Sequence, residues 1–122
     1  MTLYAALLYY PPDRYWLDPA EHHTAPGYAD FFESATAGGV LRGGQALHPA
    51  GHAATITVAD NKGGHVTTTP GPAVQTPQTL GGFYLIEAAD MQEATNWAAQ
   101  IPAAWRGTIE LRPVVPMQDK PA

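Results

Sequence analysis

Short apolar runs and two-residue alternation of hydrophobic and polar residues predict a chain rich in β-strands. Runs of this length, bounded by glycine, proline or asparagine, are typical of strands. The predicted strands are residues 3–10, 40–47, 53–60, 65–69, 80–88 and 108–114. Asn61-Lys62-Gly63-Gly64 lies between the third and the fourth and predicts the turn of a hairpin.

Two other segments have the spacing of amphipathic helices. Asp18, followed by proline and then by Glu21, has the arrangement of a helix capping box. Pro26-Gly27 interrupts this first turn, and hydrophobic residues then recur at i, i+3, i+4 and i+7 within residues 28–35. We therefore expect a helix there, ended by Gly38-Gly39.

The second helix is predicted after Asp90, where Glu93 follows in a capping arrangement. Its hydrophobic face holds Ala94, Trp97, Ala98 and Ile101. We expect Pro102 to end this helix. Trp97 is expected in the core, as are Phe31 and Phe32 of the first helix.

The order of predicted elements is that of an α+β fold with a ferredoxin-like split βαβ pattern. Two helices can cover only one face of an antiparallel sheet, so the other face needs a partner. In the last strand, Ile109 and Leu111 point to one side, while Glu110 and Arg112 point to the other. We expect two copies to pack sheet against sheet as a homodimer, with a pocket between sheet and loop.

The composition of the chain excludes several classes of function and agrees with this fold. The chain has 122 residues, which fits a single domain over 1–114 with a tail at 115–122. It contains no cysteine, which excludes thiolate chemistry. A net charge of −5 with scattered basic residues argues against nucleic acid. No apolar run reaches membrane-spanning length and no secretory signal is visible, so we expect a cytoplasmic protein.

Several segments together resemble the YCII-related family, in its DGPF branch. LYAALLYY resembles the first strand of that family, and GGVLRGGQALHP resembles the end of its first helix and its second strand. The strongest resemblance is GPAVQTPQTLGGFYLIEAADMQEATNWAAQIPAAWRGTIELRPV at residues 71–114. The resemblance implies a dimeric α+β barrel with a cleft, and a lyase-like activity on a small organic molecule.

The chain departs from that family where its acidic residue is expected. Pro70 stands in place of the family's Asp before Gly-Pro, and Ala73 in place of the Phe after it. Gln75 stands where an acidic residue usually follows. The sister branch pairs a helix histidine with an Asp, and that histidine falls on Tyr28 here. Neither half of the dyad carries over.

Histidines are the leading candidates for acid–base chemistry, because their ordinary pKa suits proton transfer near neutrality. His52 is expected in the third strand beside the second, at the mouth of the cleft. His22 is the second choice, as a pocket-edge residue or a solvated one. His48 and His52 are four residues apart, but Pro49 and Gly51 break a helix there. No spacing of ligands supports a metal, and no cofactor is indicated.

Glu110 and Arg112 are the other candidates for a site, as a carboxylate base beside an anchor for an anionic substrate. The alternative is a structural ion pair at the dimer interface. Arg42 on the second strand is a further anion contact or a solvated edge residue, and Gln75 is a polar contact to substrate.

Four aromatic residues are further candidates for the site. Tyr15 and Trp16 form either a lid over an apolar ligand or a satellite cluster. The phenol of Tyr9 or that of Tyr84 is expected to stabilise an oxyanion.

Two functions remain open from the sequence. The first is a cofactor-independent lyase, isomerase or cyclase that acts by proton transfer on a small molecule with a carboxylate or carbonyl and an apolar body, in a biosynthetic tailoring step. The second is a non-catalytic binding or accessory module that has lost the family's acid. If the 70–78 loop lies far from the cleft, its departures from the family pattern say nothing about activity. If it lines the cleft, the loss of charge means either a new reaction or none.

Overall fold

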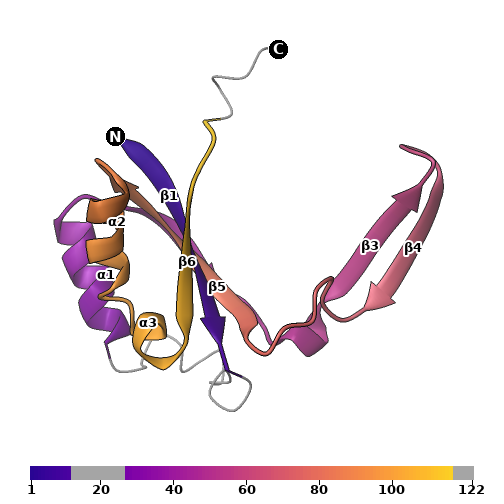
Figure 1. Cartoon of the computed structure of the whole chain (residues 1–122), viewed down its shortest axis with the longest axis horizontal. Helices are drawn as coiled ribbons and strands as arrows, with labels where there is room; N and C mark the ends of the chain where they lie inside the picture. The colour runs from indigo at the N-terminus through magenta and orange to yellow at the C-terminus, as the bar shows by residue number, and fades with distance from the viewer. Residues whose placement is uncertain (12–26, 117–122) are drawn as a thin grey trace.

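The computed structural model describes residues 1–11 and 27–116 of the chain. It consists of a body, in which helices cover one face of a sheet, and a hairpin that stands away from it (Figure 1). The described elements are β1 (Thr2–Tyr10), α1 (Tyr28–Ala37), β2 (Leu41–Ala46), the short 3₁₀ helix η2 (Ala50–His52), β3 (Ala54–Ala59), β4 (His65–Pro70), β5 (Thr79–Ala88), α2 (Met91–Ala98), α3 (Pro102–Arg106) and β6 (Thr108–Pro113). The strands agree closely with those that the hydrophobic pattern predicts.

The body contains a four-stranded sheet in the order β2-β5-β1-β6. Every neighbouring pair is antiparallel, with Leu7 opposite both Phe83 of β5 and Glu110 of β6. The strands that follow α1 and α2 lie at the two edges, as a split βαβ arrangement requires. The predicted α+β, ferredoxin-like class is therefore confirmed.

The hairpin formed by β3 and β4, called the arm below, does not join this sheet. β3 pairs with β4 alone, from Ala54 opposite Pro70 to Ala59 opposite His65. The predicted turn is confirmed, with Asp60 and Asn61 both at positive φ. The expectation that the third strand lies beside the second is wrong, because η2 redirects the chain after β2 (Figure 1).

The core lies between the sheet and the helices. Alternate β1 residues from Tyr4 to Tyr10 are buried. All but Tyr4 pack in one cluster with Phe31 of α1, Ile86 of β5 and Ile101 before α3. Tyr4 packs in a second cluster with Ala88 and Ala94. These side chains are almost fully withdrawn from solvent, with Phe31 at 1% exposed and Ile86 and Ile101 at 0%. Burying apolar surface on this scale is the main favourable contribution to folding.

The capping box of α2 is confirmed. The Asp90 carboxylate accepts from the Glu93 backbone N–H at 2.9 Å, and the Glu93 carboxylate accepts from the Ala89 N–H at 3.2 Å. Pro102 was expected to stop a helix, but α2 ends before it and Pro102 opens α3. A proline suits the first turn of a helix because the N–H that it lacks has no helical partner there.

The beginning of α1 differs from the prediction in part. The capping box at Asp18 and Glu21 lies outside the described residues. The helix begins at Tyr28, as the renewed spacing indicates, after Gly27 at positive φ. Phe31 is buried, but Phe32 is 58% exposed, so its assignment to the core is wrong. The two residues are neighbours on a helix and cannot both face the sheet.

The second face of the sheet, called the open face below, carries no helix of the described chain (Figure 1). Its centre is apolar and half-buried, with Leu3, Ala5 and Leu7 of β1 opposite β5 and with Phe83 and Leu85 of β5. This face lies on the same side of the body as the arm (Figure 1).

Candidate functional site

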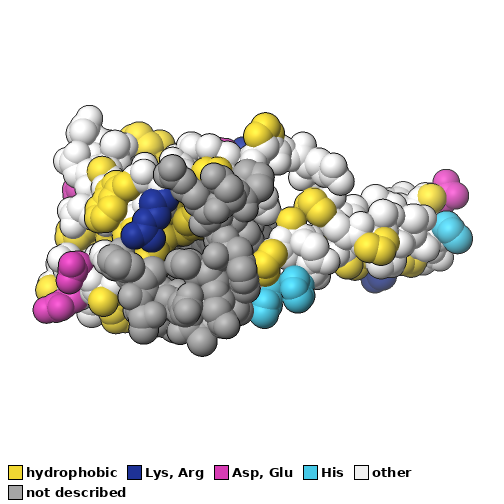
Figure 2. Space-filling view, turned by 90° about the horizontal axis from the view of Figure 1, so that it is seen from below, with side chains coloured by type: hydrophobic (Ala, Val, Ile, Leu, Met, Phe, Trp, Pro, Cys, Tyr) yellow, Lys and Arg dark blue, Asp and Glu magenta, His cyan; other side chains and the backbone are white. Residues whose placement is uncertain are grey.

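A cleft lies where the arm joins the body, called the histidine cleft below. Its volume is about 780 Å³, within the usual range of small-molecule sites. It is lined by Tyr9, Leu47, His48, Pro49, Ala50, His52, Ala53, Pro72, Ala73, Val74, Gln75, Thr76, Thr79 and Leu80. Figure 2 shows histidine side chains at this junction, on the face seen from below. Three sequence candidates, His52, Tyr9 and Gln75, therefore meet in one cavity.

His48 and His52 lie face to face at the edge of this cleft. Their ring centroids are 5.0 Å apart and the planes differ by 29°. The turn η2 brings them together, since the His52 N–H donates to the Pro49 carbonyl at 2.9 Å. Pro49 and Gly51 rule out a regular helix between the two histidines, yet the short 3₁₀ turn places their rings side by side. His52 ends η2 and does not lie in a strand, which corrects its expected position.

The loop after β4 forms another part of the cleft wall. Gly71, at φ 100°, turns the chain. Its N–H donates to the Ala53 carbonyl at 2.7 Å, and its carbonyl accepts from the Thr55 hydroxyl at 2.9 Å. The following residues, from Pro72 to Thr76, line the cavity. The side chains of this loop therefore contribute directly to the chemistry of the cleft.

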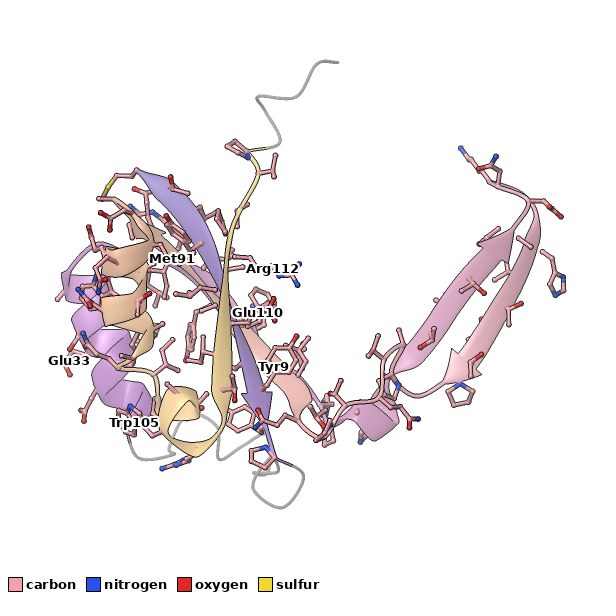
Figure 3. All side chains as sticks on the ribbon, in the orientation of Figure 1. Tyr9, Glu33, Met91, Trp105, Glu110 and Arg112 are labelled. Atoms are coloured by element: carbon pink, nitrogen blue, oxygen red, sulfur yellow. The ribbon has the colours of Figure 1, made fainter. Side chains whose placement is uncertain are left out.

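Glu110 and Arg112 lie on the open face of the sheet. Their side chains point to the same side, as predicted, and the Arg112 guanidinium donates a hydrogen bond to the Glu110 carboxylate (Figure 3). This hydrogen bond raises the pKa of Arg112, which stays a cation. Neither residue lines the histidine cleft. Tyr9 connects the two regions, because it lines the cleft and lies on the same face (Figure 3).

Arg42 occupies the other edge of the sheet. It pairs with Glu87 of β5 at 3.2 Å, and both side chains are partly exposed. β2 and β6 are separated by two intervening strands, so Arg42 and Arg112 lie on the order of 14 Å apart across the sheet. They do not converge on one anionic group.

His22, Tyr15 and Trp16 lie outside the described residues. Among the described residues, no group of three or more histidine or acidic side chains has an arrangement that could hold a metal ion. No helix within 1–11 and 27–116 combines the length and apolarity needed to cross a membrane.

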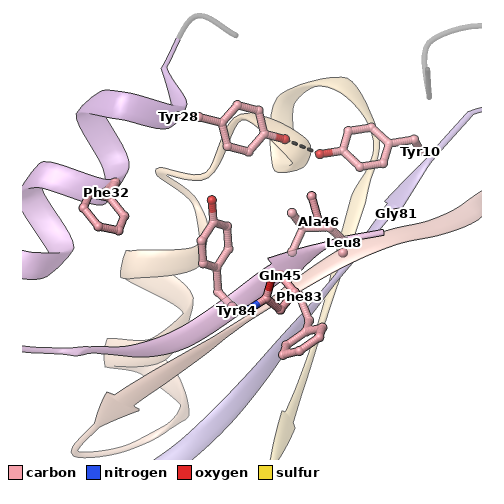
Figure 4. Close-up of a pocket in the computed structure, with 11 residues that line it drawn as sticks. Leu8, Tyr10, Tyr28, Phe32, Gln45, Ala46, Gly81, Phe83 and Tyr84 are labelled. Atoms are coloured by element: carbon pink, nitrogen blue, oxygen red, sulfur yellow. Dashed lines mark hydrogen bonds between the residues drawn. The ribbon is translucent and has the colours of Figure 1, made fainter. Parts of the chain in front are cut away.

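A second cavity, called the tyrosine pocket below, lies between α1 and the sheet (Figure 4). It has a volume of about 350 Å³ and contains Tyr10, Tyr28 and Tyr84, with Phe32 at its edge. The hydroxyls of Tyr10 and Tyr28 share a hydrogen bond, and the Tyr84 hydroxyl points toward them (Figure 4). Phe31 packs behind Tyr84 with ring centroids 4.9 Å apart.

All three phenols of the tyrosine pocket are stabilised in the neutral form. Burial raises the pKa of Tyr84 to about 12. It also raises the pKa of Tyr10, and that of Tyr28 still further, where the hydrogen bond to Tyr10 adds to burial. The phenols act as hydrogen-bonding groups at neutral pH. The sequence indicates Tyr84 as a candidate phenol, but not its neighbours Tyr10 and Tyr28. These two lie eighteen residues apart and meet only in the folded chain.

Comparison with known proteins supports the family that the sequence resembles. No curated protein matches this sequence. The YCII-related domain matches residues 2–118, which is almost the whole chain. With its split βαβ sheet and the cleft beside the 70–78 loop, the protein belongs to the YCII-related family.

Proposed function

We propose that the protein is a cofactor-independent enzyme that moves a proton on a small organic substrate in the histidine cleft. The observation that carries this proposal is the convergence of His52, Tyr9 and Gln75 on one cavity of about 780 Å³. Histidine is the side chain best suited to exchange a proton near neutral pH. The apolar wall formed by Ala73 and Val74 suits a substrate with an apolar body.

In this mechanism the His52 imidazole accepts a proton from a carbon next to a carbonyl group. The electron pair of the broken C–H bond forms an enolate, whose oxygen accepts a hydrogen bond from the Tyr9 phenol or the Gln75 amide. The proton then returns to another carbon in an isomerisation, or the enolate expels a leaving group in a lyase step. The ring stack with His48 holds the imidazole of His52 in place.

The resemblance to the DGPF branch supports an active cleft with altered chemistry. Pro70 stands where that branch has an acid, and the loop that follows it lines the cavity. Because residues 70–78 contain no carboxylate, we assign the base to a histidine of η2, which lines the same cleft. Glu110 is the less favoured base, because Arg112 already occupies its carboxylate.

We also infer that the open face is the interface of a homodimer. A half-buried apolar centre at Leu3, Leu7, Phe83 and Leu85 is unfavourable in water. A two-fold partner with the same face buries both copies, and Glu110–Arg112 then forms an ion pair within that interface. The predicted mass is about 26 kDa, twice 13.0 kDa.

Deuterium exchange tests the catalytic proposal without a known substrate. A panel of lactones and carboxylated ketones is incubated with the protein in D₂O, and exchange at the carbon next to the carbonyl is followed by NMR. We expect His52→Gln to slow exchange by about 10²–10⁴-fold. His65→Gln, on the arm and outside the cleft, is the matched control. Equal exchange by His52→Gln and the unchanged protein contradicts the assignment.

A non-catalytic binding module is the second candidate, and the tyrosine pocket favours it. Three neutral phenols around an apolar space donate and accept hydrogen bonds but do not exchange protons near neutrality. Binding of a panel compound without any exchange, weakened by Tyr84→Phe and unaffected by His52→Gln, supports this function over the first.

A further inference from the structure

The arm has two chemically different faces. Residues directly opposite in an antiparallel ladder point to the same side. One side therefore carries Ala54, Ile56, Val58, Val66, Thr68 and Pro70, and the other carries Thr55, Thr57, Ala59, His65, Thr67 and Thr69. The first set, called the apolar side of the arm, has a single hydroxyl and no charge.

This apolar side is uncovered in the isolated chain. Ile56 is 64% exposed, Val58 45% and Val66 58%. A two-stranded hairpin is marginally stable on its own in water, and this arm pairs with no third strand of the described chain. Its apolar side needs a flat, uncharged surface to pack against.

We propose that each arm packs its apolar side on a second copy of this chain, as a clasp that closes the dimer. The proposal rests on the homodimer inferred above and goes beyond it, because packing of the open faces alone leaves both arms uncovered. A second copy is the occupant that the chain itself indicates. The arm stands on the open-face side of the body, where the partner must approach (Figure 1).

The areas involved fit this arrangement. A strand of six residues is about 20 Å long and a pair of strands about 10 Å wide, so one side of the arm covers on the order of 200 Å². Two arms and the surfaces that they cover bury on the order of 800 Å², about half of a standard interface. The open faces supply the remainder, so that clasp and sheet contact together reach the area of a stable dimer.

The distribution of charge on the arm is also compatible with packing against a second copy. Asp60 and Lys62 are confined to its turn, and His65 lies on the threonine side. The charges of the open face are paired within it, Arg42 with Glu87 and Arg112 with Glu110. An interface built from these surfaces leaves no unpaired charge buried.

Neighbouring residues of β3 provide a matched test. Val58→Lys places a charge on the apolar side, and Thr57→Lys places the same charge on the opposite side. We expect Val58→Lys to raise the dimer dissociation constant by at least about tenfold, because each dimer contains two arms. Thr57→Lys should change it less than about threefold. Sedimentation measures both constants, and circular dichroism verifies that both variants fold.

Alkylation of single introduced thiols gives a second readout, since the chain has no cysteine. The thiol of Val58→Cys should react at least about tenfold more slowly than that of Thr57→Cys in the dimer, and dilution should remove the difference. A mass of 13.0 kDa at all micromolar concentrations overturns both the dimer and the clasp. A dimer in which both lysine variants dissociate alike, and both thiols react alike, overturns the clasp alone.

Discussion

The body and the arm use the same alternating pattern of strand residues with opposite results. In β1, alternate residues from Tyr4 to Tyr10 are buried beneath helices. In the arm, Ile56, Val58 and Val66 alternate with threonines in the same way, and all three are exposed. The difference is that helices of the described chain cover the strands of the body, whereas none of its described elements covers these residues of the arm.

The body and the arm contribute differently to the histidine cleft. The body is held by its own core and provides a rigid frame, which positions Tyr9 at the end of β1. The histidine cleft lies where that frame joins the arm, whose apolar side chains are exposed. If the arm packs against a second copy, dimer formation also restricts the motion of the cleft residues that border the arm, such as Ala53 and Pro72.

The largest expected effect on stability is in the body. Phe31→Ala removes a ring that is 1% exposed and should lower the free energy of unfolding by about 3–5 kcal/mol. Ile56→Ala on the arm, measured at a concentration where the protein is monomeric, should lower it by less than about 1 kcal/mol. Urea titration measures both. Equal losses would show that the arm is part of the same folding unit.

A glycine at the arm's turn allows the two regions to be separated. A Cβ on Gly64 would lie 1.7 Å from the Ala59 carbonyl oxygen, so Gly64→Ala must displace the turn. We expect hydrogen exchange at residues 54–59 and 65–70 to accelerate by at least about tenfold, while β1 and β5 keep their protection. Gly51→Ala, where a Cβ meets nothing within 4 Å, is the control. Faster exchange in β1 as well would contradict the separation.

Alkaline pH should weaken the body through the tyrosine pocket. The pKa of Tyr84 is about 12 in the folded protein, above the ordinary value of 10.0. The folded state therefore binds this proton more tightly, and its contribution to stability is complete below pH 10 and is lost as the pH rises toward 12. Tyr84 alone should lower the free energy of unfolding by up to about 1.4 kcal/mol per pH unit in this window, in addition to the contributions of Tyr10 and Tyr28, whose pKa values are also raised. Tyr84→Phe should flatten the slope, and an unchanged slope would exclude Tyr84 as the cause.

The smallest effect is expected at the edge of the open face. Glu87→Gln removes the ion pair with Arg42, in which both side chains are partly exposed. In the monomer this should lower stability by about 0.2–1 kcal/mol, and added salt should reduce the effect. A loss of several kcal/mol at dimer-forming concentration would place this pair inside the interface. Thermal unfolding at two protein concentrations distinguishes the two cases.

The elements that local chemistry determines could be predicted from the sequence. The Asp90 cap, the turn after Ala59 and the strand alternation at Ile109–Arg112 depend on neighbouring residues alone, and all agree with the structure. The detached arm could not be predicted, because periodicity identifies a strand but not its neighbour. The pattern of β3 fits a fifth strand of the sheet equally well.

The candidate site was predicted in part for a similar reason. His52, Tyr9 and Gln75 were selected for their chemistry, and the fold brings them to one cavity. The stack of His48 on His52 depends on a 3₁₀ turn that proline and glycine spacing does not specify. The meeting of Tyr10 with Tyr28 depends on the tertiary fold, which joins residues eighteen positions apart.

Crystals soaked with the lactone and keto-acid panel test the proposed cleft most directly. The expected result is ligand density in the histidine cleft, with a carbonyl oxygen within hydrogen-bonding distance of Tyr9 or Gln75 and an acidic C–H facing the His52 ring. Density in the tyrosine pocket alone, or a histidine cleft closed by protein side chains, would contradict the proposed site of proton transfer.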